Sequence, residues 1–266
     1  MTALRDYFCA EPAGGEGTWQ FVLGDHLYGA FGGIFGGAVA AVSVMTARSL
    51  APGWLAAGID CRFLRPLRAG AVRARGTRLH RGRTMTVVAV DLHDAQERVV
   101  AHSTVSLVDS GALEPINLDG EAPAVAPGGI PWNAPGEAFA PIAEVLHPRM
   151  QRARDGGVAS TVTIPWEGAA TGAEAVCVAA DLCVGPPVGS VAQRHPDGAA
   201  FPNPDMVLRF AGADSPAVAA ARELIGVGRL ARCAGGLAAV DIEVWATGSI
   251  AAVGAATTLL LRARSR

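Results

Sequence analysis

The sequence predicts an α+β protein built from two similar halves, each with a buried helix followed by an antiparallel sheet. Three observations support this. An uncharged run rich in alanine and valine precedes stretches in which apolar and polar residues alternate, the same order returns later in the chain, and a proline- and glycine-rich segment separates the two. The chain has 266 residues, half of them apolar, which is enough to fill such a core. We therefore expect an N-terminal unit over residues 1–110, a linker over 111–136 and a C-terminal unit over 137–266.

The first helix is expected within the uncharged run from Leu27 to Ala47. These 21 residues are long enough to cross a bilayer of about 30 Å. Five glycines between residues 28 and 37, however, each cost a helix about 1 kcal/mol. A glycine-rich loop followed by a short helix, from Gly37 to about Arg48 and buried in the protein, explains the run more simply. Association with a membrane through this run remains an alternative that fractionation would test.

Alternation of apolar and polar residues predicts four antiparallel strands, over residues 57–66, 70–80, 85–93 and 98–108. In the second half the expected strands are 144–151, 160–166, 204–210, 224–233, 236–245 and 249–262. A helix is expected over residues 175–184, ending at Gly185-Pro186-Pro187. Asp60 and Asp205 occupy equivalent places in the two repeats, which favours a role at the start of a strand over catalysis.

Composition excludes several classes of function. Lys and Arg total 22 against 24 for Asp and Glu, and the arginines are spread along the chain, so no basic groove for nucleic acid is expected. The five cysteines are scattered and the six histidines lack metal-ligand spacing, so neither a disulfide framework nor a metal site is expected. No G-x-S-x-G motif is present, which argues against an α/β-hydrolase. The N-terminus lacks a signal-peptide pattern, so we expect a cytoplasmic protein that does not bind membranes.

Four short stretches, taken in order, resemble the acyl-CoA thioesterase II-like family. They are the run Phe35 to Ala41, Phe63-Leu-Arg-Pro66 with Arg81-Gly-Arg-Thr84, Ala179-Ala-Asp181 with Pro202-Asn-Pro-Asp205, and the closing run Ile250 to Arg262. The resemblance spans about residues 19–262. It implies a double hotdog fold, in which each of two long helices is wrapped by an antiparallel sheet. It also implies hydrolysis of an acyl-CoA thioester to a free acid and CoA, with no cofactor besides the CoA of the substrate.

Asp181 is the main catalytic candidate. It is the only charged residue between Glu174 and Arg194, in a segment of apolar residues. A carboxyl group in such surroundings is costly to ionise, so its pKa should rise towards the range of a general base. A place on the solvent side of the helix, or a capping role, would explain the residue equally simply. The resemblance implies that Asp181 is the catalytic aspartate.

Asn203 and Thr257 are the expected partners of Asp181, and both depart from the family's pattern. Asn203 lies between two prolines that hold the backbone extended, so its amide would point in one direction and orient a water. The family more often has a hydroxyl residue there, and a turn at the start of a strand is the simpler alternative. Thr257 stands where the family usually has glutamine, and threonine is common in strands for purely structural reasons.

Gly36 and Gly37 are expected to bind the substrate at the start of the first helix. Backbone N–H groups there are unpaired and carry partial positive charge, which suits the oxyanion formed from a thioester carbonyl. Close packing of helix and sheet would require glycine as well, and both roles are compatible.

We therefore expect an acyl-CoA thioesterase that acts on a small-molecule substrate, with a non-catalytic acyl or acyl-CoA binder as the alternative. Either face of the fused sheet offers a surface for homo-oligomers. The eight arginines between residues 62 and 83 would either meet the phosphates of CoA or form a solvated strand face. The sequence does not define which acyl chain is bound.

Overall fold

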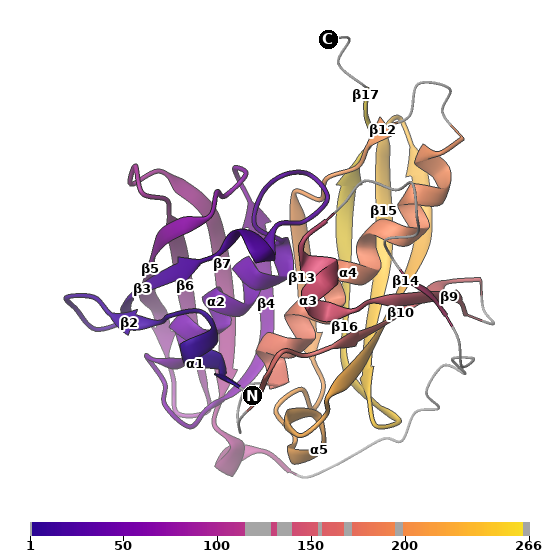
Figure 1. Ribbon diagram of the computed structural model, residues 1–266. Coiled ribbons are helices and arrows are strands. Elements are labelled where there is room, and N and C mark those ends of the chain that lie inside the picture. Colours follow the sequence, from indigo (N-terminus) through magenta and orange to yellow (C-terminus); the bar gives the residue numbers. More distant parts are fainter. Residues whose placement is uncertain are drawn as a thin grey trace.

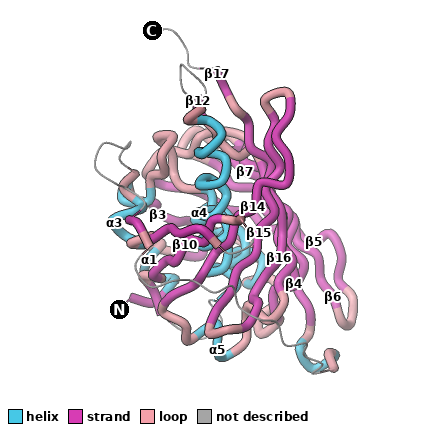
Figure 2. Tube along the Cα trace, turned by 90° about the vertical axis from the view of Figure 1, so that its right-hand side faces the viewer, coloured by secondary structure: helices cyan, strands magenta, loops and turns pink. Residues whose placement is uncertain are grey.

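The computed structural model describes residues 2–114, 129–131, 140–153, 156–167, 172–194 and 199–262. Its main feature is a sheet of thirteen strands, all paired antiparallel, with two long helices against one face (Figure 1, Figure 2). From edge to edge the strands are β2 (Glu11–Pro12), β3 (Thr18–Leu23), β5 (Gly70–Arg81), β6 (Met85–His93), β7 (Val99–Val108), β4 (Leu55–Phe63), β13 (Asp205–Phe210), β16 (Ser249–Leu259), β15 (Leu237–Ala246), β14 (Glu223–Ala234), β10 (Val158–Thr163), β9 (Arg149–Arg152) and β8 (Ile130–Pro131).

The two halves repeat one arrangement, as the sequence predicts. The order β3-β5-β6-β7-β4 in the first half corresponds to β10-β14-β15-β16-β13 in the second, and the halves join where β4 pairs with β13. Each half contributes one long helix, α2 (Gly36–Arg48) or α4 (Gly172–Ala192). The remaining elements are α1 (Leu4–Tyr7), α3 (Ile142–Leu146), α5 (Pro216–Ala219), the 3₁₀ turns η1 (Asp25–Leu27) and η2 (Ser110–Ala112), and the short pairs β1 (Thr2–Ala3) with β11 (Trp166–Glu167) and β12 (Ala199–Ala200) with β17 (Leu261–Arg262).

Two reciprocal ion pairs cross the junction between the halves. Arg62 on β4 pairs with Asp205 on β13 at 2.5 Å, and Arg209 on β13 pairs with Asp60 on β4 at 2.8 Å. The two acids of the repeat therefore tie the two strands together, consistent with a structural role. Because Arg62, Arg209 and Asp60 are each about half exposed to solvent, each pair contributes roughly 1 kcal/mol or less to stability.

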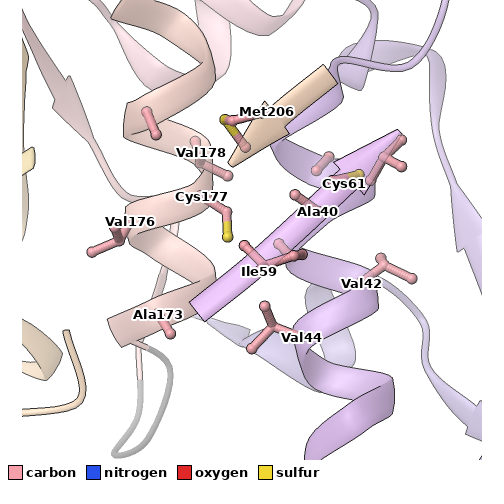
Figure 3. Packing of buried hydrophobic residues seen from close by; sticks show 14 of the residues in the cluster. Ala40, Val42, Val44, Ile59, Cys61, Ala173, Val176, Cys177, Val178 and Met206 are labelled. Atoms are coloured by element: carbon pink, nitrogen blue, oxygen red, sulfur yellow. The ribbon is translucent and has the colours of Figure 1, made fainter. Parts of the chain in front are cut away.

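The hydrophobic core lies between the sheet and the two helices (Figure 3). Small residues bring the helices close together, since a Cβ added at Gly37 of α2 would lie 2.7 Å from the Cα of Val178 on α4. The sheet also approaches α4 closely, because a Cβ at Gly226 of β14 would lie 2.6 Å from the carbonyl oxygen of Ala179. Burial on nearly all sides explains why these helices carry alanine and valine on most faces.

Helix α4 continues through Pro186 and Pro187, so the prediction that it ends at Gly185 is wrong. Each proline removes one helical hydrogen bond, and an interior proline usually costs about 3 kcal/mol. Packing offsets this cost: Val188 beyond the prolines is fully buried, and Gly228 of β14 leaves room for the carbonyl of Cys183. Local propensity is thus overridden by tertiary contacts.

The prediction of a single strand over residues 144–151 is also wrong. The chain forms α3, turns at His147 with φ 44°, and then enters β9 at Arg149. The spacing of four between Ile142 and Leu146 places both on one helix face, and both are buried in the core.

The two long apolar helices lie inside the fold. Residues 37–44 of α2 are all buried. Among the described residues, α4 alone is long and apolar enough to cross a membrane, and 72% of its most apolar window is buried inside the protein. Both helices therefore serve as core helices here. The predicted linker 111–136 lies largely outside the described residues, so the domain boundaries stay a prediction.

Candidate active site

A cavity of about 890 Å³ lies between the two halves. Its walls come from the glycine loop before α2, the end of β4, the middle of α4 and the segment that leads into β13. The lining is mostly apolar, and the charged residues within its described part are Asp181, Arg65 and Arg152. An apolar cavity with few polar groups is the usual form of a small-molecule site.

Asp181 is buried, only 8% exposed, and lines this cavity from α4. Its Oδ2 accepts a hydrogen bond from the backbone N–H of Gly37 at 2.9 Å. Its Oδ1 accepts one from the side-chain amide of Asn203 at 2.7 Å. The residue at the N-cap of α2 is Phe35, whose side chain makes no capping hydrogen bond. Asp181, from the other half of the chain, takes the place of the cap.

Burial raises the pKa of Asp181 from 3.8 to about 6, and the hydrogen bonds from Asn203, Gly37 and Gly36 oppose this rise. The partial positive charge at the start of α2 acts in the same direction. The carboxyl group is therefore ionised at neutral pH, yet basic enough to take a proton from water.

Asn203 is held in place by the strands on both sides. The carbonyl of Pro204 accepts a hydrogen bond from the N–H of Phe63 at 2.8 Å, and that of Pro202 accepts one from Leu259 at 3.0 Å. These bonds fix the extended segment between the end of β4 and the end of β16. The structure thus places Asn203 beside Asp181, and its second amide N–H has no partner among the described residues.

Gly36 and Gly37 lie at this site, but the structure shows a different contact from the predicted one. The N–H of Gly37 donates to Asp181, so in this state it is not free for a substrate oxyanion. The physical reason is that the start of a helix attracts any nearby anion, and Asp181 is the nearest. A Cβ at Gly36 would lie 3.0 Å from both carboxylate oxygens of Asp181 and 2.9 Å from the ring of Phe63. Glycine is therefore needed here for the approach of the carboxylate.

Thr257 is not brought to Asp181, contrary to the predicted trio. Thr257 on β16 is paired with the exposed Ala239 on the neighbouring strand β15. Its backbone N–H donates a hydrogen bond to Oδ1 of Asp205 at 2.8 Å. Because side chains alternate along a strand, Thr257 points away from the core and the neighbouring Thr258 points into it. Thr258 is fully buried, and its hydroxyl has no hydrogen-bond partner in the described part of the chain.

Two aromatic residues of the cavity wall were missed in the sequence. Phe31, on the glycine loop before α2, and Phe201, before β13, are in edge-to-face contact with ring centroids 5.3 Å apart. Phe201 also rests on Gly185 and Gly189 of α4. Glycines on both sides of Phe31, and the closeness of Phe201 to Asn203 in sequence, were the signals available.

The start of α4 also contacts a carboxylate, that of Asp214, but this carboxylate is paired with a cation. Asp214 accepts a hydrogen bond from the N–H of Ala173 at 3.2 Å and forms an ion pair with Arg48. Arg48 also pairs with the buried Glu174 at 2.9 Å. Burial raises the pKa of Glu174 to about 7, and the charge of Arg48 opposes this. A cation neutralises this cluster, whereas only neutral donors contact Asp181.

The described residues offer neither a cysteine nucleophile in the core nor a metal cluster. Burial raises the pKa of Cys61 to about 12 and that of Cys183 still higher, which leaves both thiols protonated and unreactive. No group of three or more His, Cys, Asp or Glu side chains is placed to hold a metal ion in this part of the chain.

Comparison with known proteins identifies the fold. Residues 26–108 match the family model of the acyl-CoA thioesterase N-terminal domain. No curated protein sequence matches significantly. The TesB protein of Mycobacterium avium subsp. paratuberculosis is 16% identical, with a TM-score of 0.72 over 94% of this chain and 95% of that one. Acyl-CoA thioesterase II TesB2 of Mycobacterium marinum is 16% identical, with a TM-score of 0.73 over 98% of each chain. A hotdog protein of unknown function from Alicyclobacillus acidocaldarius is 19% identical, with a TM-score of 0.77 over 98% of each chain.

These likenesses agree with the repeat of helix and sheet described above. The structural matches cover nearly the whole chain, so both halves share the arrangement. Residues 26–108 are therefore similar in sequence to the acyl-CoA thioesterase N-terminal domain, and the whole chain shares the fold of the two solved TesB proteins.

Proposed function

We propose that this protein hydrolyses acyl-CoA thioesters, with Asp181 as the general base. The observation that carries the proposal is the buried carboxylate of Asp181, which lines an apolar cavity and is held by Asn203 and the N–H of Gly37. A carboxylate kept ionised in such a place, with its pKa raised to about 6, is typical of a catalytic group. The match of residues 26–108 to an acyl-CoA thioesterase domain supports the same reaction.

In the proposed reaction, Asp181 takes a proton from a water molecule as that water attacks the thioester carbonyl carbon. A carboxylate has about four acceptor sites, and Asn203, Gly37 and Gly36 occupy three of them, which leaves one for the water. The tetrahedral intermediate then expels the sulfur: the C–S bond breaks, and Asp181 returns the proton to the CoA thiolate. The products are the free acid and CoA, and Asp181 is ionised again.

Asn203 is proposed to position the water. One of its amide N–H groups holds Asp181, while the second N–H and the carbonyl oxygen remain to contact the water or the developing oxyanion. The start of α2 stabilises the ionised base in this scheme. The acyl chain is proposed to occupy the apolar part of the cavity, which includes Phe31, Phe63 and Phe201.

A non-catalytic acyl-CoA binder is the second candidate, and the position of Thr257 favours it. Because that side chain faces away from Asp181, only Asn203 remains of the two expected partners. A single amide has to orient the water if the chain is an enzyme.

Release of free thiol from short, long, branched and aromatic acyl-CoA esters tests the proposal. Wild type should hydrolyse at least one ester, and Asp181→Asn should lose about 10²- to 10⁴-fold in rate, the usual contribution of a general base. Ligand binding by the variant should persist in calorimetry. Asp60→Asn, which removes the same charge on the exposed side of β4, is the matched control and should keep full activity.

Two results would contradict the proposal. If wild type and Asp181→Asn both bind the esters and release no thiol, the protein is a binder. If both hydrolyse an ester at the same rate, another group is the base.

A further inference from the structure

We propose that Arg65 and Arg152, two exposed residues of the cavity lining, bind the phosphate groups of the substrate's carrier. This inference rests on the proposed thioesterase activity and names the substrate class: a thioester of a phosphorylated nucleotide carrier such as CoA.

The two arginines reach the same cavity from opposite halves of the chain. Arg65 follows the end of β4, and Arg152 ends β9. Both line the cavity that contains Asp181, and both are solvent-exposed, whereas Asp181 is buried. A substrate with its thioester at Asp181 must lead its hydrophilic carrier out through the exposed part of the lining. Among the described residues, Arg65 and Arg152 supply the positive charge of this exposed lining.

Neither arginine has a carboxylate partner among the described residues. The guanidinium of Arg65 donates one hydrogen bond, at 2.5 Å, to the backbone carbonyl of Val99, which orients the group without neutralising it. For Arg152 the described part of the chain contains no ion pair and no side-chain hydrogen bond. Eight other arginines do form ion pairs with acids, namely Arg48, Arg62, Arg73, Arg75, Arg78, Arg98, Arg209 and Arg229.

The charge balance of the cavity fits an anion near its opening. Among the described lining residues Asp181 is the only carboxylate, and it is buried with its own hydrogen bonds. Guanidinium groups bind phosphate with paired N–H donors, and an unpaired guanidinium retains this capacity. Two such groups in a mostly apolar lining would also attract a polyanionic substrate from solution.

Comparison of acyl-CoA with acyl-pantetheine, which carries the same acyl group and no phosphate, tests the inference. Arg65→Glu and Arg152→Glu should each raise KM for acyl-CoA by about tenfold or more, the scale of one charged hydrogen bond. For acyl-pantetheine, KM and kcat should stay within about twofold of wild type. Arg83→Glu is the matched control, because it reverses the charge of an exposed arginine outside the cavity lining.

The dependence of KM on salt concentration is a second measurement, and a folding defect would not change it in the same way. Added salt should raise KM of wild type for acyl-CoA, and this dependence should weaken in the double variant Arg65→Glu/Arg152→Glu.

The inference is overturned if both single variants leave KM for acyl-CoA unchanged, or if they change KM for acyl-CoA and KM for acyl-pantetheine equally. If wild type hydrolyses acyl-pantetheine and acyl-CoA with equal KM, the phosphates are not recognised, while the thioesterase proposal stands. If it hydrolyses neither, the proposed function itself fails.

Discussion

Removal of the charge of Asp181 should change how stability depends on pH. In the folded protein, burial raises the pKa of this carboxyl group from 3.8 to about 6. The folded state therefore binds more protons than the unfolded state between these two values. Stability consequently falls as pH rises through this window, and it stays lowered above it.

The size of the effect follows from the two pKa values. A difference of about two pKa units corresponds to about 3 kcal/mol at 1.36 kcal/mol per unit. Relative to Asp181→Asn, which cannot ionise, wild type should lose about 3 kcal/mol of unfolding free energy between pH 4 and pH 7. The asparagine side chain keeps one acceptor for the two donors, Gly37 and Asn203, so a pH-independent loss of about 1 kcal/mol is expected besides.

Urea denaturation of both proteins at several pH values measures this difference, and the other titrating groups cancel in the comparison. In parallel, kcat/KM of wild type for an acyl-CoA ester should rise with pH to a plateau, with its midpoint near 6. If the stability difference does not change with pH, Asp181 is not destabilised by burial, and the physical basis for its role as a base is refuted.

Three further predictions concern neighbouring residues. Arg48→Met should lower the unfolding free energy by about 3 to 5 kcal/mol in urea, because the buried Glu174 loses its cation. Gly37→Ala should cost about 1 to 3 kcal/mol in the same assay and slow thioester hydrolysis, because its Cβ would force α2 away from α4; unchanged stability would contradict the packing. Thr258→Val should leave stability equal or higher, since the buried hydroxyl has no partner among the described residues, and Thr257→Val should leave kcat unchanged; a loss of kcat in Thr257→Val would restore its catalytic role.

Much of the fold could be predicted because its elements follow local patterns. The alternation over residues 85–93 matches β6 residue for residue, since one face of that strand is buried and the other is not. Helix α2 was expected from Gly37 and begins one residue earlier. Proline misled the prediction for α4, where packing against β14 outweighs the local cost. In the site, Asp181 could be identified as a lone acid among apolar residues, and Asn203 by its flanking prolines.

The sequence by itself determined which segments are apolar, which strands alternate, and that Asp181 is the single charged residue between Glu174 and Arg194. Only the tertiary structure decided that Asp181 meets the N–H of Gly37, 144 residues away, and that Thr257 faces outward while Thr258 faces in. The reason is physical. The periodicity of apolar residues in a sequence reflects which side chains are buried. Which residue a buried side chain contacts depends on how the two halves of the chain pack against each other. That packing is set by the close approach of α2 and α4 and by the pairing of β4 with β13.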